Sequence, residues 1–268
     1  MLADYHVHLE RGPYTLEWLE QFLRQAERVG IAELGIVEHL YRFVEARPAL
    51  YNDWVAKRQT QHLDDFLELI ARAKQRGWPV KLGLEVDYIP GKEDAIRQVT
   101  QGLPLDFLIG SVHWLGDWCF DADAASWEGR DLLQVYRQYY DVLAQAVESG
   151  LFDILGHPGN IAYFGFTPRW DDRRRIEASF LERIRPLRRQ ICLEVNTGGL
   201  LRPGHTRFPS LGLLRHLRSL DFDITLSSDA HRPEDVGYAF ADTVALLRQM
   251  TFQNLCHFRN RRQRLVRF

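Results

Sequence analysis

Histidines recur in this chain where short apolar runs end. His6 and His8 close the first run, and residues two apart on a strand face the same side. Glu85 lies near the end of the third run, and Asp229 lies just after the last. Other runs are followed in turn by His39, His113, His157 and His231. Imidazoles and carboxylates are the usual ligands of Zn, Mn and Fe, so this pattern indicates a metal site.

Eight such side chains exceed what one tetrahedral ion can use, which predicts two or three clustered divalent metals. A single histidine after an apolar run is more often a hydrogen-bonded core residue than a ligand. Histidines placed at random would not all fall at the same end of successive strands. Metals about 4 Å apart suit in-line displacement at phosphorus. The pattern therefore predicts a multinuclear hydrolytic centre and leaves open which of Zn, Mn or Fe occupies it.

Short runs alternate with amphipathic stretches, which favours an α/β fold with a parallel sheet. Thr15 and Gly30 bound one helical stretch as cap and stop, and others are expected to end at Arg76 and to span about 132–148, 173–187, 211–220 and 235–247. Seven strands are expected: Leu2–Val7, Leu34–Val37, Val80–Val86, Phe107–Val112, Ile154–Leu155, Ile191–Val195 and Ile224–Leu226. Active sites of such folds lie at the carboxyl ends of the strands, where the histidines fall. A β/α barrel needs about 250 residues, so one domain over 1–268 is predicted.

The composition fits a cytoplasmic protein and favours neither a nucleic-acid nor a membrane partner. Lys and Arg number 34 against 36 Asp and Glu, so nothing global favours a nucleic-acid partner. No run is long enough to cross a membrane, and the first residues do not read as a signal peptide. The three cysteines lie far apart and suit a reducing compartment. Neither composition nor pattern indicates an oligomeric state.

The ordered motifs resemble those of the PHP family, the polymerase-associated and histidinol-phosphatase domains. They read DYHVH at 4–8, EH at 38–39, GLEVD at 83–87, GSVH at 110–113, GHP at 156–158 and SSDAH at 227–231. The resemblance covers nearly the whole chain and implies a distorted seven-stranded β/α barrel with up to three metals. It implies these ligands: His6, His8, Glu85 and Asp229 for one ion, Glu85, His113 and His157 for a second, and His39 with His231 for a third.

The third site departs from the family pattern. Many members carry a further His or Asp shortly after the HxH pair, and here Tyr14 stands about where it would be. Glu10 or Glu38 would have to substitute for it. The resemblance thus implies a firm pair of ions and an incomplete third site.

The segment EVNTGGLLRP at 194–203 resembles the histidinol-phosphatase branch. That implies a phosphomonoesterase of histidine biosynthesis, which releases phosphate from L-histidinol phosphate through attack by a hydroxide bridging two metals. Glu85, Asp229 and His231 would be catalytic. The basic residue expected after the GHP motif is missing, since 160–165 reads NIAYFG. Other rim residues would contact the substrate: Arg202 first for phosphate, then Arg11 and Arg42, with Asn196 and His205 as further contacts.

Three alternatives stay open at this point. The barrel could act on another small phosphate ester or a nucleotide, it could bind metal without turnover, or it could be an amidohydrolase-type enzyme. Four aromatic residues of one loop are expected to wall the substrate pocket: Trp114, Trp118, Phe120 and Trp127. The basic tail after Phe258 is expected to pack as a terminal segment through Leu265, Val266 and Phe268.

Overall fold

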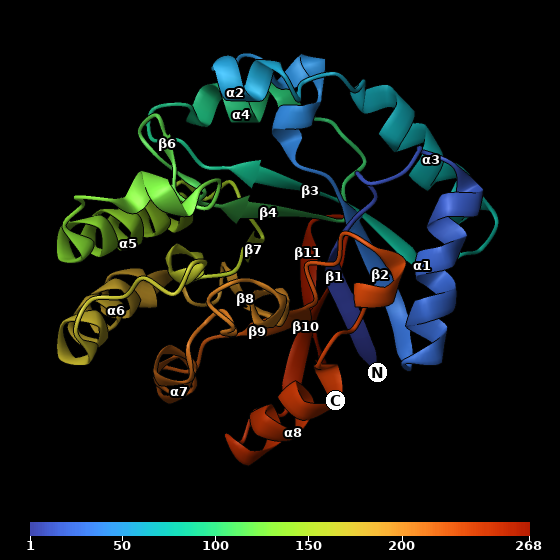
Figure 1. Ribbon diagram of the computed structural model, residues 1–268. Coiled ribbons are helices and arrows are strands. Elements are labelled where there is room, and N and C mark those ends of the chain that lie inside the picture. The colour runs from blue at the N-terminus through green and yellow to red at the C-terminus, as the bar shows by residue number, and fades with distance from the viewer.

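The computed structural model describes residues 1–268 and contains all seven predicted strands as one parallel sheet. Figure 1 shows them gathered around a common centre with the helices outside. In sheet order the strands are β1 (Leu2–His8), β2 (Ile31–Val37), β3 (Val80–Asp87), β4 (Phe107–Ser111), β7 (Ile154–Leu155), β8 (Cys192–Asn196) and β9 (Ile224–Ser227). The β/α architecture predicted from the alternating pattern is confirmed.

The segment after β9 brings the last strand back to the first. Ala230 pairs with Val7 in a parallel bridge. Its N–H donates to the carbonyl of His6 at 3.3 Å, and its carbonyl accepts from the N–H of His8 at 2.8 Å. These bonds close the sheet into a distorted barrel.

The helices form an outer layer and bury their apolar faces against the sheet. In α1 the hydroxyl of Thr15 accepts from the N–H of Trp18 at 3.2 Å, which confirms the predicted cap. The full set is α1 (Leu16–Arg28), α2 (Asp53–Ala56), α3 (Leu63–Gln75), α4 (Glu93–Thr100), α5 (Leu132–Glu148), α6 (Trp170–Ile184), α7 (Leu211–Ser219) and α8 (Phe240–Gln249). None is both long and apolar enough to cross a lipid bilayer.

Two helices, α2 and α4, were not predicted, and a third, α8, begins later than expected. α4 was missed because it buries only Ile96 and Thr100, too few positions for a clear period. α8 begins five residues later than expected. Residues 233–235 form a separate 3-10 turn, and Ala239 takes a left-handed conformation with φ of 54° that interrupts the helical path.

β1 carries a bulge that changes which of its residues face the barrel interior. Asp4 pairs with Leu34 and Val7 with Ile36, so β1 has one more residue than β2 over this interval. Tyr5 belongs to a nine-residue apolar cluster, whereas Val7, two residues on, belongs to the larger core beneath the helices. The extra residue lets His6 and His8 face the interior above Tyr5.

The C-terminal residues close the amino end of the barrel as an antiparallel hairpin, β10 (Asn254–Arg259) and β11 (Arg262–Arg267). Phe258 packs on Tyr5 and Phe107 with ring centroids 5.2 and 5.9 Å apart. A second hairpin, β5 (Trp114–Leu115) and β6 (Trp118–Cys119), follows β4. The tail therefore packs as expected, but not through Leu265, which is 52% exposed.

Candidate metal centre

Glu85 lies at the middle of the histidine cluster and is almost fully buried. One carboxylate oxygen, Oε1, lies 2.9 Å from Nε2 of His157 and 3.6 Å from Nε2 of His113. The other, Oε2, faces three further imidazole nitrogens: Nδ1 of His39 at 2.7 Å and Nε2 of His6 and of His8, both at 3.4 Å. One carboxylate therefore separates two groups of imidazoles.

Asp229 lies across the cluster from Glu85 on the segment that closes the barrel. Its Oδ1 is 3.7 Å from Nε2 of both His6 and His8, and 3.3 Å from Nε2 of His231. The rings of His8 and His231 stack at 4.5 Å. All eight side chains predicted as ligands thus meet at the carboxyl end of the barrel.

Several nitrogen and oxygen atoms of this cluster are buried without a hydrogen-bond partner: Nε2 of His6, both ring nitrogens of His8, Nδ1 of His39, Oε2 of Glu85 and Nδ1 of His157. Nδ1 of His39 and Oε2 of Glu85 lie 2.7 Å apart, but not in hydrogen-bond geometry. A buried polar atom without a partner costs about 1–3 kcal/mol, so such a concentration is unstable on its own. Imidazole and carboxylate lone pairs directed at a common point suit a divalent transition metal. The residues therefore fit the metals that the sequence predicted.

Ligand atoms close enough to share an ion form overlapping groups of three residues. One holds His6, His8 and Glu85, and a second holds Glu85, His113 and His157. A third unites His231 with His8 and Asp229. The first two overlap with the ligand sets implied by the family resemblance. The third does not contain His39, which lies instead against Glu85.

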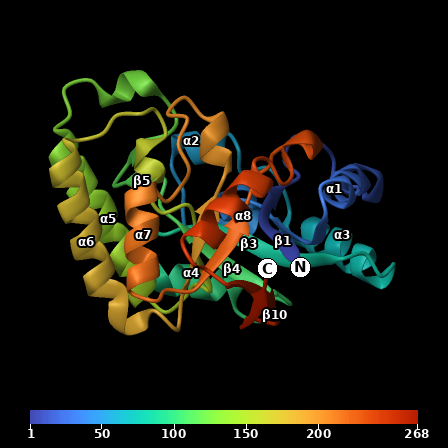
Figure 2. The same ribbon diagram turned by 90° about the horizontal axis from the view of Figure 1, so that it is seen from below.

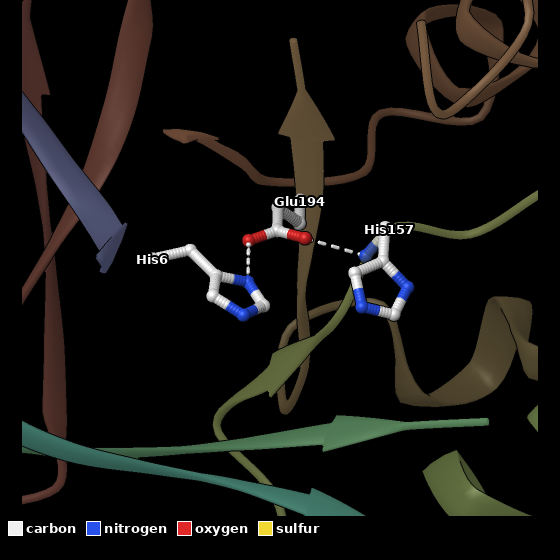
Figure 3. A group of neighbouring side chains, drawn as sticks. All are labelled: His6, His157 and Glu194. Carbon is white, nitrogen blue, oxygen red and sulfur yellow. Dashed lines mark hydrogen bonds and ion pairs between the residues drawn. The ribbon is translucent and has the colours of Figure 1, made fainter. Parts of the chain in front are cut away.

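Glu194 orients one of these histidines and was not singled out in the sequence. Its Oε1 accepts from Nδ1 of His6 at 2.7 Å, and its Oε2 accepts from the backbone N–H of His157 at 2.5 Å (Figure 3). The first bond leaves Nε2 of His6 as the free lone pair, directed at Glu85 and Asp229. Although Glu194 is close enough to be a ligand, both its oxygens are already occupied.

Two further carboxylates do the same for other histidines. Asp87 accepts from Nδ1 of His113 at 2.7 Å, and Glu10 accepts from Nδ1 of His231 at 2.9 Å. The second oxygen of Glu10 accepts from Arg42 at 2.9 Å. Glu10 therefore supports a ligand and does not occupy the missing ligand position itself.

Neither Tyr14 nor Glu38 completes the third site. The ring of Tyr14 packs on Phe66 at 5.6 Å. Glu38 is fully buried, and its Oε1 accepts from the backbone N–H of Leu9 at 2.8 Å. Glu38 belongs to no group of close ligand atoms. Neither residue therefore replaces the extra ligand that many family members carry at the third site.

The cluster favours ionised carboxylates. Burial opposes the charge on Glu85, but His39 and His6 hold its pKa well below the usual range. Burial likewise opposes the charge on Asp229, whose pKa is held well below normal by His6 and His231. Both side chains are thus present as the anions that metal binding requires.

A cavity of about 240 Å³ opens above the cluster. Arg202 and Arg11 line it, and Arg202 Nη2 lies 3.6 Å from Oδ2 of Asp229. The other proposed substrate contacts do not line it. Arg42 is paired with Glu10, Asn196 is buried behind the wall, and His205 is exposed with its ring on the carbonyl of Leu200.

The aromatic loop after β4 contributes only in part. Trp114 lines the cavity, but Trp118 and Trp127 pack on one another at 5.0 Å, and Phe120 packs on Tyr139. These three cover the barrel instead of walling the pocket. Side chains that sequence reasoning missed complete the wall, among them Tyr41, Trp54, Asp121, Asn160, Tyr163 and Phe208.

Four of these wall residues share one signal in the sequence. The three long irregular stretches at 41–54, 116–129 and 200–209 supply Tyr41, Trp54, Asp121 and Phe208, and long loops in compact domains are usually functional. For Asp87 the signal was its position two residues after Glu85 on one strand. Glu194 offered no comparable signal, because its role depends on the neighbouring strands.

A closed parallel barrel with a histidine and carboxylate cluster at the carboxyl ends of its strands defines a β/α-barrel protein built to bind divalent metals. Residues 4–198 match the sequence model of the PHP domain. The chain belongs to the PHP family.

Its relatives include a probable histidinol-phosphatase of Deinococcus radiodurans, 31% identical over 93% of this chain and 94% of the relative. The histidinol-phosphatase of Bacillus subtilis is 25% identical over 88% of this chain and 96% of its own. The histidinol phosphate phosphatase of Lactococcus lactis, solved with zinc, L-histidinol and phosphate, superposes with a TM-score of 0.79 at 22% identity, covering 98% of both chains. These matches confirm the family and the fold.

Proposed function

We propose that this chain is a metal-dependent phosphomonoesterase that hydrolyses L-histidinol phosphate to L-histidinol and phosphate. The observation that carries the proposal is the convergence of eight ligand side chains, with unpartnered buried atoms, beneath a cavity that contains Arg202. The names of the full-length relatives support the substrate.

His6, His8, Glu85 and Asp229 would hold one ion, and Glu85 would share a second with His113 and His157. Bound there, the metals supply Lewis acidity toward phosphoryl oxygens and activation of a water molecule. A third ion would rest on His231, whose ring centroid lies 6.2 Å from that of His39.

Arg202 binds and orients the phosphate in this proposal. It reaches the cavity from the loop after β8, and Asp229 holds its guanidinium close to the cluster. Burial works against its charge, yet Asp229 and Tyr163 raise its pKa further, so it stays a cation. A guanidinium matches phosphate oxygens with two parallel hydrogen bonds. Arg11, on the exposed side of the cavity, is the second phosphate contact.

Asp121 recognises the cationic end of the substrate. The other acidic side chains of the cavity wall already face cations or imidazoles: Glu10, Glu85 and Asp229. Asp121 accepts only from the amide of Asn160 at 3.3 Å and the thiol of Cys119 at 3.2 Å. L-Histidinol carries an ammonium group and an imidazole ring, either of which would supply the missing positive charge.

The test is phosphate release from L-histidinol phosphate and from a panel of nucleotides and sugar phosphates by metal-loaded protein. The highest kcat/KM is expected for L-histidinol phosphate, because that ratio measures differential transition-state binding. Another ester better by about tenfold would overturn the substrate assignment. No release from any ester would overturn the phosphatase itself. The cytoplasmic location and the assignment of 1–268 to one domain stay predictions.

A further inference from the structure

A groove of about 680 Å³ lies between α6 and α7, on the outer face of the barrel. Figure 2 shows the two helices side by side. The groove shares no lining residue with the cavity above the metal centre. Its volume falls within the range of small-molecule sites, about 300–1,000 Å³.

Positive side chains dominate this groove. Glu177 is its only carboxylate, and it is 5% exposed. Nε of Arg173 donates to Oε1 of Glu177 at 2.8 Å, so these two charges neutralise each other. The remaining charged lining residues are Arg174, Arg175 and Arg215, with His216 beside them.

These three arginines have no ion-pair partner in the protein. At the opposite end of α6, by contrast, Arg183 pairs with two carboxylates, those of Asp141 and Glu148. Guanidinium groups that share one groove without counter-charges repel one another and attract an anion. The groove is thus a site of uncompensated positive charge.

The first turn of α7 opens into the same groove. Ser210 caps it by accepting from the N–H of Leu213 at 3.2 Å, while the N–H groups of Leu211 and Gly212 have no partner within the helix. A side chain built on Gly212 would meet only Oγ of Ser210, at 3.9 Å. The open space at Gly212 leaves room for a ligand beside this helix N-terminus, which adds a second anion-attracting feature to the arginines.

Trp170 adds an aromatic surface at the start of α6. It lines the groove and is 70% exposed, more than any other large hydrophobic residue of the chain. The guanidinium of Arg174 lies over its ring at 5.1 Å. Exposed tryptophan faces stack on nucleobases, and this stacking tolerates any base.

We propose that this groove binds a nucleoside di- or triphosphate. The phosphates contact Arg174, Arg215 and the first turn of α7, and the base stacks on Trp170. Arginine suits this ligand because its planar fork donates two hydrogen bonds to one phosphate. The site is independent of the metal centre and of the phosphatase activity proposed for it.

The experiment is calorimetric titration of the metal-loaded protein with the non-hydrolysable nucleotide AMP-PNP. Arg174→Ala/Arg215→Ala should weaken binding about tenfold or more, since two charge-assisted contacts are lost. Trp170→Ala should weaken it roughly fivefold. Arg24→Ala/Arg28→Ala removes the same charge from the exposed face of α1 and should leave the affinity unchanged. All variants should keep the melting temperature and the phosphatase activity of the parent.

Four results would overturn the proposal. The first is no binding of AMP-PNP, or binding unchanged in Arg174→Ala/Arg215→Ala. The second is binding lost in Arg202→Ala instead, because the nucleotide would then lie at the metal centre. The third is that inorganic pyrophosphate binds as tightly as AMP-PNP and Trp170→Ala leaves the affinity for AMP-PNP unchanged. In the fourth, a single-stranded oligoribonucleotide binds more tightly than AMP-PNP and loses affinity in the arginine variant, which would make the groove an RNA surface.

Discussion

At the carboxyl ends of its strands the barrel buries imidazoles and carboxylates, whereas at their amino ends it buries aromatic and aliphatic side chains. At the amino ends of the strands, the rings of Tyr5, Phe107 and Phe258 contact one another edge-on or tilted. The Tyr5 hydroxyl also accepts from the N–H of Phe258 at 3.0 Å. At the carboxyl ends, polar atoms of four histidines and of Glu85 are buried without hydrogen-bond partners. The same strands thus stabilise the fold at one end and provide reactive groups at the other.

Removal of the metals is expected to have the largest effect, and it acts at the carboxyl ends of the strands. Chelation should abolish phosphate release and lower the melting temperature, because ions that bind only the folded state stabilise it. Zinc or manganese should restore both. Elemental analysis of protein purified without chelator should find about two or more equivalents per chain. One equivalent or fewer after supplementation would contradict a multinuclear centre.

Within the metal centre at the carboxyl ends of the strands, Glu85→Ala should lower kcat/KM by more than about 100-fold, since Glu85 lies between the two groups of imidazoles. His39→Ala should cost less, because His39 belongs to no group of close ligand atoms and Glu85 keeps its contacts with four other imidazoles. Both variants need their metal content measured and their folding checked by circular dichroism. Loss of activity in His39→Ala with activity kept in Glu85→Ala would mean that the ligands are assigned to the wrong sites.

At the amino ends of the strands, Phe258→Ala should reduce the free energy of unfolding by about 3–5 kcal/mol, because removal of a fully packed ring leaves a cavity. Urea denaturation measures this, and kcat/KM per folded molecule should stay unchanged. Leu265→Ala on the same hairpin is the control, since Leu265 is half exposed. A drop in bound metal for Phe258→Ala in folded protein would show that the two ends are coupled.

Substitution of a residue that orients a ligand should lower activity less than substitution of the ligand itself. Glu194→Gln should lower metal affinity or kcat/KM by roughly 10–100-fold, because an amide oxygen cannot replace both acceptor oxygens of the carboxylate. Glu182→Gln on the exposed face of α6 is the matched control. Equal metal affinity and kcat/KM in the two variants would argue against an orienting role for Glu194.

The smallest effect is expected at the cavity wall. Asp121→Asn should raise the KM for L-histidinol phosphate about two- to fivefold, the loss of one ionic contact, with kcat little changed. Hydrolysis of p-nitrophenyl phosphate, which has no cationic group, should be unaffected. An equal effect on both substrates would assign Asp121 to the metal centre instead of the substrate.

The comparison of the two ends also explains what the sequence could predict. Strands and ligands were predictable because β-branched runs end in histidines, and parallel strands bring their carboxyl ends together. Glu194 and Asp87 were not singled out, since an orienting carboxylate is identified only by which imidazole lies beside it. Trp118 and Trp127 were misplaced because the direction of a loop side chain depends on packing that the sequence pattern does not contain.

The bulge in β1 lay beyond prediction for a related reason. The sequence from Ala3 to His8 alternates without interruption, and alternation alone would put Tyr5 and His6 on opposite faces. Only the pairing with β2 reveals the extra residue. The C-terminal hairpin was obscured by its arginines, which stay in water while Phe258 enters the barrel.

The segment Asp229–His231 has a consequence for synthesis and maturation. Ala230 bonds to the backbone on either side of Val7, while the residues flanking Ala230 supply ligands to the same centre as His6 and His8. His6 and His8 therefore leave the ribosome more than two hundred residues before Asp229 and His231. Barrel closure and completion of the metal centre become one late event. An ion at the first site would lack Asp229 until then, so its stable loading has to await the nearly finished chain.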